Sequence, residues 1–418
     1  MTPEVKERIE QIRHGNVPEG YALSEMAIFP AEWNLVSIAD VGTVITGSTP
    51  PTTNTDYYAG KKLFITPADF NTGLYIRESE RTISDAAYSV SRIIPPNSIY
   101  VVCIGATVGK INMCADAAVC NQQINAVVPK KGNDSVFLYY CIAYFFNKMK
   151  KKYIGEQTLP IVSKGQFSKI HIVLPQIEEQ RKVANILTEQ DGIIEQKEKL
   201  LEEKQRQKKY LMQQLLTGKK RLPGFDGEWK RDKLGKLFTE RSEIKCEHLE
   251  LLAITGTQGV IPRSQLDLKD NSSEDKSKYL RICVGDIGYN TMRMWQGVSA
   301  YSNYEGIVSP AYTILKPNSM INAKYFAYLF KMPDVVFLFY RFSQGLVDDT
   351  RNLKYENFKK ISVTYPADIE EQNAIVAVLE KADQEIELIR QSIEQEKQKK
   401  KALMQLLLTG IVRVPTDK

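Results

Sequence analysis

The sequence is poor in the side chains that most often hold metal ions. Its 418 residues include only three histidines and six cysteines, and no two cysteines form a C-x-x-C pair. His14, His171 and His248 do not lie at metal-ligand spacing from any cysteine, which excludes a zinc site of the usual pattern. The irregular spacing of the cysteines predicts buried free thiols in a reducing compartment.

The chain also lacks a strong charge and a long apolar run. Lys and Arg number 56 against 50 Asp and Glu, a net charge of +6, so a nucleic-acid surface must come from local arrangement rather than from a basic tail. There is no signal peptide and no membrane-spanning segment, which predicts a cytoplasmic protein. A chain of this length exceeds one hydrophobic core, so two or three domains are expected.

Catalytic fingerprints are missing as well. There is no glycine-rich cofactor motif, no Asn-Pro-Pro-aromatic motif, no H-E-x-x-H and no G-x-S-x-G. The segment Gly105–Ile111 resembles a phosphate-binding loop, but it is one residue short and has Ile111 where Ser or Thr would reach Mg²⁺. The alternative is a strand-to-loop turn that offers backbone N–H groups and Lys110 to a nucleic-acid phosphate. Glu243 and Lys245 have the spacing of some nucleases without a placed upstream acid, which favours a solvated surface pair.

What the sequence does contain is one stretch of 42 residues that occurs twice. Residues 177–218 and 369–410 both begin Ile-Glu-Glu-Gln and end Leu-Leu-Thr-Gly, and 18 of the 42 aligned positions are identical. Each copy follows a proline, Pro175 or Pro366, and closes on a glycine suited to a helix C-terminus. The repeat predicts two helices, each roughly 60 Å long at about 1.5 Å per residue.

Heptad spacing predicts that these helices form a coiled coil. The second copy keeps a 3-4 spacing from Ile375 to Leu407, whereas the first has lysines at positions 197, 204 and 208 of its seam. The simplest partner of each helix is the other copy. The polar middle of the first helix is then either less tightly paired or used on another subunit. A dimerising coiled coil and an internal spacer between two similar domains both fit the pattern.

The segments ahead of the two helices are also alike. Glu32-Trp33 opens the first and Glu228-Trp229 the second, and each closes with a helix, a glycine-containing loop and a terminal strand. We expect a buried strand at Ser98–Ile104 and helices at Val136–Lys152 and Ala323–Phe330. The predicted division is an N-terminal domain, a central helix, a second domain, and a C-terminal helix with its tail, at residues 1–175, 176–218, 219–366 and 367–418.

Loops in both domains concentrate side chains that can read DNA bases. Arginine suits guanine and Asn or Gln suits adenine, and all three occur within Asn290–Gly297. The alternative is that such amides only satisfy loop backbone groups. The candidate DNA-binding residues are Ser48, Thr49, Thr66, Asp69, Lys110, Asn121, Gln122, Gln123, Thr158, Lys164, Arg263, Asn290, Arg293, Gln296, Ser309 and Arg351.

These motifs together resemble the specificity subunit of type I restriction-modification systems. The resemblance is carried by the Glu-Trp openings, the two Ile-Glu-Glu-Gln helices that end Leu-Leu-Thr-Gly, and the loop motifs Gly47–Pro50, Thr66–Asp69, Gly285–Gly297 and Gly306–Tyr312. It covers the chain from about residue 20 onward. It implies a mixed α/β fold with two target-recognition domains separated by an antiparallel coiled coil, and a pseudo-two-fold internal repeat.

The resemblance also implies a function and partners. Each recognition domain would read one half of a bipartite, asymmetric site in double-stranded DNA, and this chain would hold no catalytic residue, cofactor or metal. Two methylation subunits would dock on the helices and use S-adenosylmethionine, and restriction subunits would use ATP and Mg²⁺. Two other functions remain open: a self-sufficient enzyme with an unrecognised active site, and an assembly or decoy protein whose loops do not bind DNA.

Overall fold

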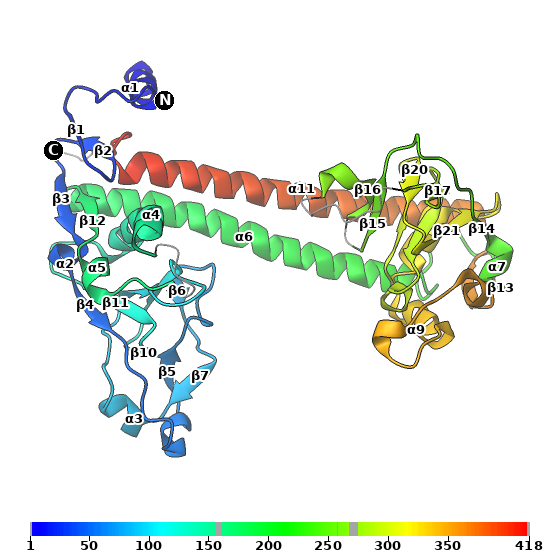
Figure 1. Cartoon of the computed structure of the whole chain (residues 1–418), viewed down its shortest axis with the longest axis horizontal. Helices are drawn as coiled ribbons and strands as arrows, with labels where there is room; N and C mark the ends of the chain where they lie inside the picture. The colour runs from blue at the N-terminus through cyan, green and yellow to red at the C-terminus, as the bar shows by residue number, and fades with distance from the viewer. Residues whose placement is uncertain (1, 155–159, 257, 267–274, 416–418) are drawn as a thin grey trace. The chain divides into compact units, whose positions relative to one another are not determined.

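The chain divides into two compact units. The computed structural model describes residues 2–154, 160–256, 258–266 and 275–415. Unit 1 comprises Met1–Lys199 and Arg390–Lys418, and unit 2 comprises Leu200–Ile389. Each unit contains one α/β domain together with one end of each of two long helices (Figure 1).

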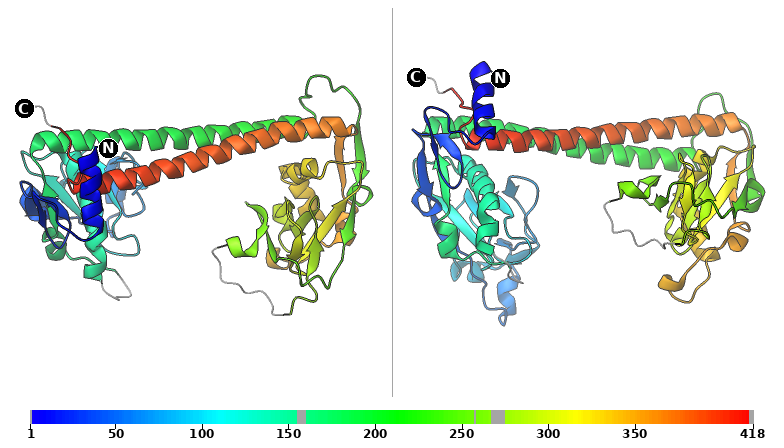
Figure 2. Two further views of the ribbon diagram at one scale, coloured as in Figure 1. Left: turned by 90° about the horizontal axis from the view of Figure 1, so that it is seen from above. Right: turned by 45° about the horizontal axis from the view of Figure 1, so that its top comes forward.

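The repeated stretch forms the two long helices, α6 (Ile177–Leu215) and α11 (Ile369–Leu408). Within each unit they run side by side in opposite directions, as two further views show (Figure 2). In unit 1, Lys197 faces Glu396, and in unit 2, Lys208 faces Asp383. The predicted antiparallel coiled coil is therefore confirmed, and each helix has the other copy as its partner.

The polar middle of the α6 seam is fully engaged with α11, which answers the expectation of looser pairing there. The Lys197 ammonium lies 2.8 Å from a carboxylate oxygen of Glu396, and the buried Gln190 amide donates to the same carboxylate at 2.8 Å. Further along α6, the pairs are Lys204 with Glu385 and Lys208 with Asp383. Lysines at these seam positions therefore meet acids of the opposite helix.

Both long helices end on a left-handed glycine that packs against a tryptophan. Gly218 and Gly410 have φ of +71° and +68°, so the glycines predicted to end the helices do so. A β-carbon on Gly218 would lie 3.3 Å from the Trp229 ring, and one on Gly410 would lie 3.0 Å from the Trp33 ring. The Glu-Trp opening of each domain thus covers the end of a long helix.

The segment after each long helix returns an arginine to the start of the other helix. In unit 1, the Arg413 guanidinium makes two hydrogen bonds of 2.7 Å to Glu179, whose side chain is 3% exposed, and lies over the Trp33 ring. In unit 2, Arg221 binds Glu371 and Trp229 in the same way. We call these two sets the unit 1 joint and the unit 2 joint.

The glutamine of each Ile-Glu-Glu-Gln motif braces the same region. Gln180 donates to the Pro175 carbonyl and accepts from the Asp134 backbone N–H, both at 2.9 Å. Its counterpart Gln372 donates to the Pro366 carbonyl and accepts from the Asn322 N–H. Asp134 and Asn322 in turn accept backbone N–H groups in the first turn of α4 (Ser135–Ile154) and of α8 (Ala323–Leu329). Each motif therefore fixes a long helix against the helix of its domain.

The main antiparallel sheets of the two units share one strand order. In unit 1 the order is β4 (Gly42–Thr46), β11 (Ile124–Pro129), β8 (Ser98–Val102), β9 (Ile111–Cys114), with β6 (Tyr75–Ile76) added in parallel. In unit 2 it is β14 (Phe238–Arg241), β21 (Tyr312–Pro317), β18 (Ile287–Asn290), β19 (Ser299–Tyr301). The β8–β9 loop (residues 103–110) and the β18–β19 loop (residues 291–298) are therefore equivalent connections. The buried strand expected at Ser98–Ile104 is β8, which ends two residues earlier.

The helix that packs on each sheet is continuous in unit 1 and broken in unit 2. The predicted helix at Val136–Lys152 is α4, which runs for 20 residues. The helix predicted at Ala323–Phe330 is α8, and a second helix that the sequence analysis did not predict, α9 (Pro333–Phe342), follows it. Pro333 cannot continue the hydrogen-bonding ladder of α8, so the chain turns at Met332 and starts again.

Shorter elements complete each unit. A two-stranded ladder lies next to each joint, β3–β12 in unit 1 and β13–β22 in unit 2. The bounds in unit 1 are α1 (Pro3–Arg13), β1 (Tyr21–Leu23), β2 (Ile28–Pro30), β3 (Asn34–Ser37), α2 (Ile38–Val41), η1 (Thr55–Tyr58), β5 (Lys62–Ile65), β7 (Arg81–Ile83), α3 (Asp85–Ser89), β10 (Val119–Cys120), α5 (Lys164–Ser168), β12 (His171–Leu174). Those in unit 2 are β13 (Trp229–Lys233), α7 (Leu234–Leu237), β15 (Leu252–Thr255), β16 (Gly259–Pro262), η2 (Arg263–Gln265), β17 (Leu280–Ile282), η3 (Met294–Gln296), β20 (Gly306–Val308), η4 (Asp348–Thr350), α10 (Tyr355–Phe358), β22 (Ser362–Pro366).

The six cysteines, all of them in the described residues, are free thiols. Cys103, Cys114, Cys120 and Cys141 are buried as predicted, but Cys246 and Cys283 are only half-buried. The expectation of six buried thiols is therefore wrong for these two, which lie at the edge of the unit 2 domain and not in its core. No helix in the described part of the chain is long and apolar enough to cross a membrane.

The joints predict a large effect of a single substitution. Arg221→Ala leaves the Glu371 carboxylate buried without its cation, and removal of one partner of a buried pair typically costs about 3–5 kcal/mol. We expect a clear fall in the thermal unfolding midpoint, with partial recovery in Arg221→Ala/Glu371→Gln. Lys220→Ala, at the exposed neighbouring residue, is the control and should leave the midpoint unchanged. Equal midpoints for Arg221→Ala and Lys220→Ala would contradict this account of the joint.

The seam predicts a specific acid sensitivity. Hydrogen bonds from Lys197 and Gln190 lower the pKa of Glu396 from 4.5 to about 2. Because the pKa is depressed in the folded state, the stabilisation is complete above pH 4.5 and is lost as pH falls toward 2. The unfolding midpoint of the natural chain should therefore fall more steeply between these pH values than that of Glu396→Gln. Glu394→Gln, on the exposed side of α11, should retain the natural slope.

Candidate nucleic-acid interface

The β18–β19 loop presents two of the predicted base readers to solvent. Met294 is fully buried in the unit 2 core and fixes the middle of the loop. Arg293 and Gln296, on either side of it, are exposed. Asn290 accepts the backbone N–H of Met292 through its side-chain oxygen at 2.9 Å. Asn290 therefore shapes the loop, while Arg293 and Gln296 are placed to meet a partner.

Two other segments with predicted residues adjoin this loop. The Thr291 N–H donates to the Ala311 carbonyl at 3.1 Å, and the Leu353 N–H donates to the Thr291 carbonyl at 2.9 Å. The turn that holds Ser309 and the segment that holds Arg351 therefore lie next to the start of the loop. The Ser309 hydroxyl accepts the Ala311 N–H at 3.3 Å, so it helps to form its own turn.

Arg351 is held on an aromatic ring that the sequence analysis missed. Its guanidinium lies 4.0 Å from the centre of the Tyr340 ring on α9, donates to the Tyr340 hydroxyl at 2.9 Å, and pairs with Asp348. The Trp295 ring from the β18–β19 loop packs edge-on against Tyr340, with ring centres 6.3 Å apart. Pro333 was the available signal, because a proline suits the first turn of a new helix and α9 carries Tyr340.

Arg263 also belongs to the surroundings of this loop. It begins η2, and its positive charge opposes the rise that burial causes in the pKa of the Tyr312 hydroxyl. Tyr312 pairs with Asn290 across the β18–β21 ladder. All six residues predicted in the second domain therefore lie around one group of loops in unit 2.

In unit 1, five predicted residues meet at the end of the sheet. The Thr49 hydroxyl donates to the Gln122 side chain at 2.5 Å, and the Asn121 amide donates to Gln123 at 2.9 Å. The Ser48 N–H donates to the Cys120 carbonyl at 2.8 Å. The residues brought together are Ser48, Thr49, Asn121, Gln122 and Gln123, and of these Thr49 and Gln122 are exposed.

The β8–β9 loop lies against this group, and it contains the segment that resembles a phosphate-binding loop. The Gln123 amide donates to the Ile104 carbonyl at 3.5 Å. The N–H groups of Gly105, Val108 and Lys110 all donate to carbonyls of the chain. They are therefore not open to a phosphate as the strand-to-loop interpretation expected, and what the loop offers is the exposed Lys110 side chain.

The remaining predicted residues of unit 1 divide into three cases. Lys164 is exposed at the start of α5, just after Val162, whose N–H donates to the Cys103 carbonyl beside the β8–β9 loop. Thr66 and Asp69 are bound to each other, since Asp69 accepts the Thr66 hydroxyl at 2.9 Å and also the Glu80 N–H. These two side chains form a turn, and their contact with DNA remains a prediction. Thr158 lies outside the described residues.

Comparison with known proteins identifies the family. The model of the type I restriction modification DNA specificity domain matches twice, at residues 30–203 and 268–398, which together make up more than half of the chain. The chain belongs to the family of type I restriction-modification specificity subunits. It carries two target-recognition domains, and the resemblance and mixed α/β fold predicted from its sequence are confirmed. A specificity subunit is a recognition component and not a catalytic one.

Several curated relatives and solved structures agree with this assignment. The MjaIX specificity subunit of Methanocaldococcus jannaschii is 31% identical over 42% of each chain, and the HindI specificity subunit of Haemophilus influenzae is 32% identical over 35% of this chain and 32% of that one. This chain thus spans less than half of these two relatives. An M. genitalium S subunit of known structure covers 95% of this chain and 99% of its own at 14% identity, with a TM-score of 0.54. A chain from a study of type I complex assembly gives 0.60 over 92% of this chain and 99% of its own, at 16% identity. These structures show the same fold.

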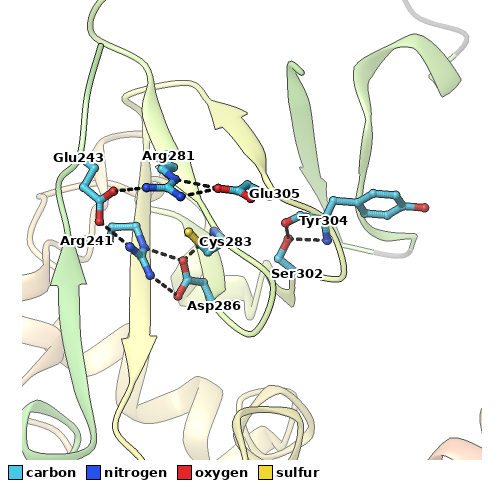
Figure 3. A network of polar contacts seen from close by, with 8 residues as sticks. All are labelled: Arg241, Glu243, Arg281, Cys283, Asp286, Ser302, Tyr304 and Glu305. Atoms are coloured by element: carbon cyan, nitrogen blue, oxygen red, sulfur yellow. Dashed lines mark hydrogen bonds and ion pairs between the residues drawn. The ribbon is translucent and has the colours of Figure 1, made fainter. Parts of the chain in front are cut away.

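Two arginines in the second domain of the specificity subunit are paired with carboxylates of the same domain. Arg241 lies between Glu243 and Asp286, and Arg281 lies between Glu243 and Glu305 (Figure 3). The Asp286 side chain is 3% exposed and also accepts the Cys283 N–H. Glu243 is therefore a structural residue of this network, which corrects its interpretation as half of a solvated pair with Lys245. In the described residues, no group of three His, Cys, Asp or Glu side chains lies close enough to hold a metal ion.

Proposed function

We propose that this specificity subunit recognises a bipartite, asymmetric site in double-stranded DNA, with one half read by each domain. The recognition domains are assigned to residues 1–175 and 219–366, and the helices between them to spacing and assembly. Arg293 and Gln296 are the proposed base readers of the second domain. Thr49, Lys110, Gln122 and Lys164 are the exposed candidates of the first.

One observation carries this proposal: the two domains share a scaffold but differ in the loops that it supports. The two sheets have the same strand order, and the β8–β9 and β18–β19 loops leave them at the same place. The first loop ends in Val-Gly-Lys, whereas the second holds Arg-Met-Trp-Gln. Because base readout depends on which donors and acceptors a loop presents, equivalent loops with different side chains suit two different half-sites.

The partners follow from the same assignment. Both α6 and α11 carry exposed residues outside their seam. Two methylation subunits would dock on these helices, and restriction subunits would join the full complex. Methyl transfer from S-adenosylmethionine and the steps that need ATP and Mg²⁺ would then belong to those partners. A cytoplasmic location is part of this proposal, and the six free thiols are compatible with a reducing compartment.

The test of readout is a substitution in the β18–β19 loop. Arg293→Ala should cost about 1–3 kcal/mol of binding to the specific site and relax discrimination at one base pair of one half-site. The reason is that arginine recognises guanine through two parallel hydrogen bonds. Binding of the complex with its methylation subunits is measured on duplexes that differ at single positions of the methylated motif.

Two further variants separate base contact from phosphate contact. Arg293→Lys keeps the charge but loses the planar fork, so it should lose discrimination and keep most non-specific affinity. Arg341→Ala removes an exposed arginine of α9 outside the loop, and it should leave discrimination intact. If Arg293→Ala weakens specific and scrambled duplexes equally, Arg293 contacts a phosphate and does not read a base.

The independence of the domains predicts the result of an exchange. Residues 34–174 are replaced by the same region of another specificity subunit, which leaves Trp33 and Glu179 of the unit 1 joint in place. One half of the methylated motif should change and the other should stay the same, because unit 2 has its own core. Sequencing of the methylated bases in cells that express the hybrid with its methylation subunits reports the outcome. A change in both halves would show that the domains read DNA jointly.

A further inference from the structure

The β8–β9 and β18–β19 loops share a backbone feature beyond their place in the fold. Each ends in a glycine two residues before the next strand, Gly109 with φ of +98° and Gly297 with φ of +76°. Side chains other than glycine rarely adopt such angles, so the chain reverses here in both domains. The position of this turn sets how the preceding loop residues project. These include Arg293 and Gln296 in one domain and Thr107 in the other.

In unit 2 a half-buried lysine holds this turn. The Lys331 ammonium, directly after α8, donates to the Gly297 carbonyl at 2.7 Å and to the Ser299 carbonyl at 2.6 Å. Among the described residues it has no carboxylate partner in an ion pair. Partial burial lowers the pKa of Lys331 to about 8. A charged, half-buried donor thus binds the last glycine of the loop and the first residue of β19.

In unit 1 the same end of the equivalent loop is held by two side chains of α4, at positions that do not correspond to Lys331. The Lys150 ammonium on α4 donates to the Val108 carbonyl at 3.0 Å, and the neighbouring Asn147 amide donates to the Gly109 carbonyl at 3.1 Å. A β-carbon on Gly109 would lie 2.5 Å from the Lys150 ammonium, so the turn sits directly on it. Burial also lowers the pKa of Lys150.

The helix positions show that this is one arrangement reached twice and not one residue repeated. The bounds of α4 match the start of α8 and the end of α9, 188 residues later, so Lys331 corresponds to Ala143 and Lys150 to Leu338. Neither lysine has a lysine at its counterpart, yet both ammonium groups reach the closing turn of the equivalent loop. The feature that recurs is the contact itself.

We propose that Lys331 and Lys150 are positioning residues for base recognition, each of which fixes the reader loop of its own domain. This inference rests on the proposed DNA-reading function and deepens it. It also gives the segment that resembles a phosphate-binding loop a role, as the first domain's reader loop with Lys110 at its exposed end. Both positioning ammonium groups are directed at loop carbonyls, so they act through the loop and not on DNA.

The test compares each lysine with a second lysine that lies nearby in the chain. Lys331→Met is paired with Lys324→Met on α8, which loses an ion pair to Glu380 on α11 instead. Lys150→Met is paired with Lys148→Met on α4, whose ammonium donates to the Met26 carbonyl away from the loop. Each full chain is purified with its methylation subunits and used to select from a library of randomised DNA duplexes, and the bound duplexes are sequenced.

The expected result is specific to one half-site. Lys331→Met should reduce base discrimination in the second domain's half by about tenfold, in the range of one good base contact, and leave the other half unchanged. Lys150→Met should do the reverse. Lys331→Arg, which keeps a charged donor, should recover most of the loss. Lys324→Met and Lys148→Met should keep both halves of the motif.

A second readout does not depend on DNA. Hydrogen exchange at the backbone amides of residues 291–298 should be faster in Lys331→Met than in Lys324→Met. Each variant is measured at a temperature equally far below its own unfolding midpoint. Unchanged exchange, or an intact motif in Lys331→Met and Lys150→Met, overturns the positioning role. Equal losses in the control variants overturn it too. A natural complex that enriches no motif at all defeats the proposed function instead, so the two failures are distinguishable.

Discussion

A buried carboxylate at the start of each long helix is the interaction on which the rest of the structure depends. An unpaired carboxylate out of water is costly, and Glu179 and Glu371 are nearly inaccessible. Each is neutralised by an arginine that lies beyond the end of the opposite helix, and that arginine also covers the tryptophan that opens the domain. The start of one helix, the end of the other and the strand at that tryptophan, β3 or β13, therefore become ordered together.

The seam between the joints adds a second constraint, on register. An apolar stripe alone tolerates sliding of two antiparallel helices by a heptad, whereas charged groups at seam positions are satisfied in few alignments. Lys208 pairs with Asp383, whose other oxygen accepts the Tyr328 hydroxyl, and Lys400 pairs with Asp191 beside Tyr140 in the same manner. These tyrosines belong to α8 and α4, so the register of the coiled coil and the placement of each domain's helix are fixed by the same contacts.

The parts of this fold that sequence reasoning could predict are those that rest on local patterns. Heptad spacing and the closing glycines identified α6 and α11 to within a few residues, and the repeated Glu-Trp marked the start of β3 and of β13. Partners far apart in sequence were not predictable: Lys197 looked like a weak point of the seam because Glu396 lies 199 residues away. In the site, loop composition located Arg293 correctly on an exposed loop. It could not show that Asp69 is occupied by its own turn, since that depends on the fold around it.

The distribution of identical and different residues between the two halves follows from what each group must do. Glu179, Gln180 and Trp33 have identical counterparts because both joints solve one problem, the burial of a helix start against a helix end. The loops face different requirements, since a domain that copied the other's donors and acceptors would read the same half-site. Lys150 and Lys331 are an intermediate case. The loop ends that they hold are equivalent, but the loops themselves differ, and the two lysines reach them from positions that do not correspond. Both domains therefore keep the contact that supports the loop, whereas the residue that makes this contact lies at a different position in each domain.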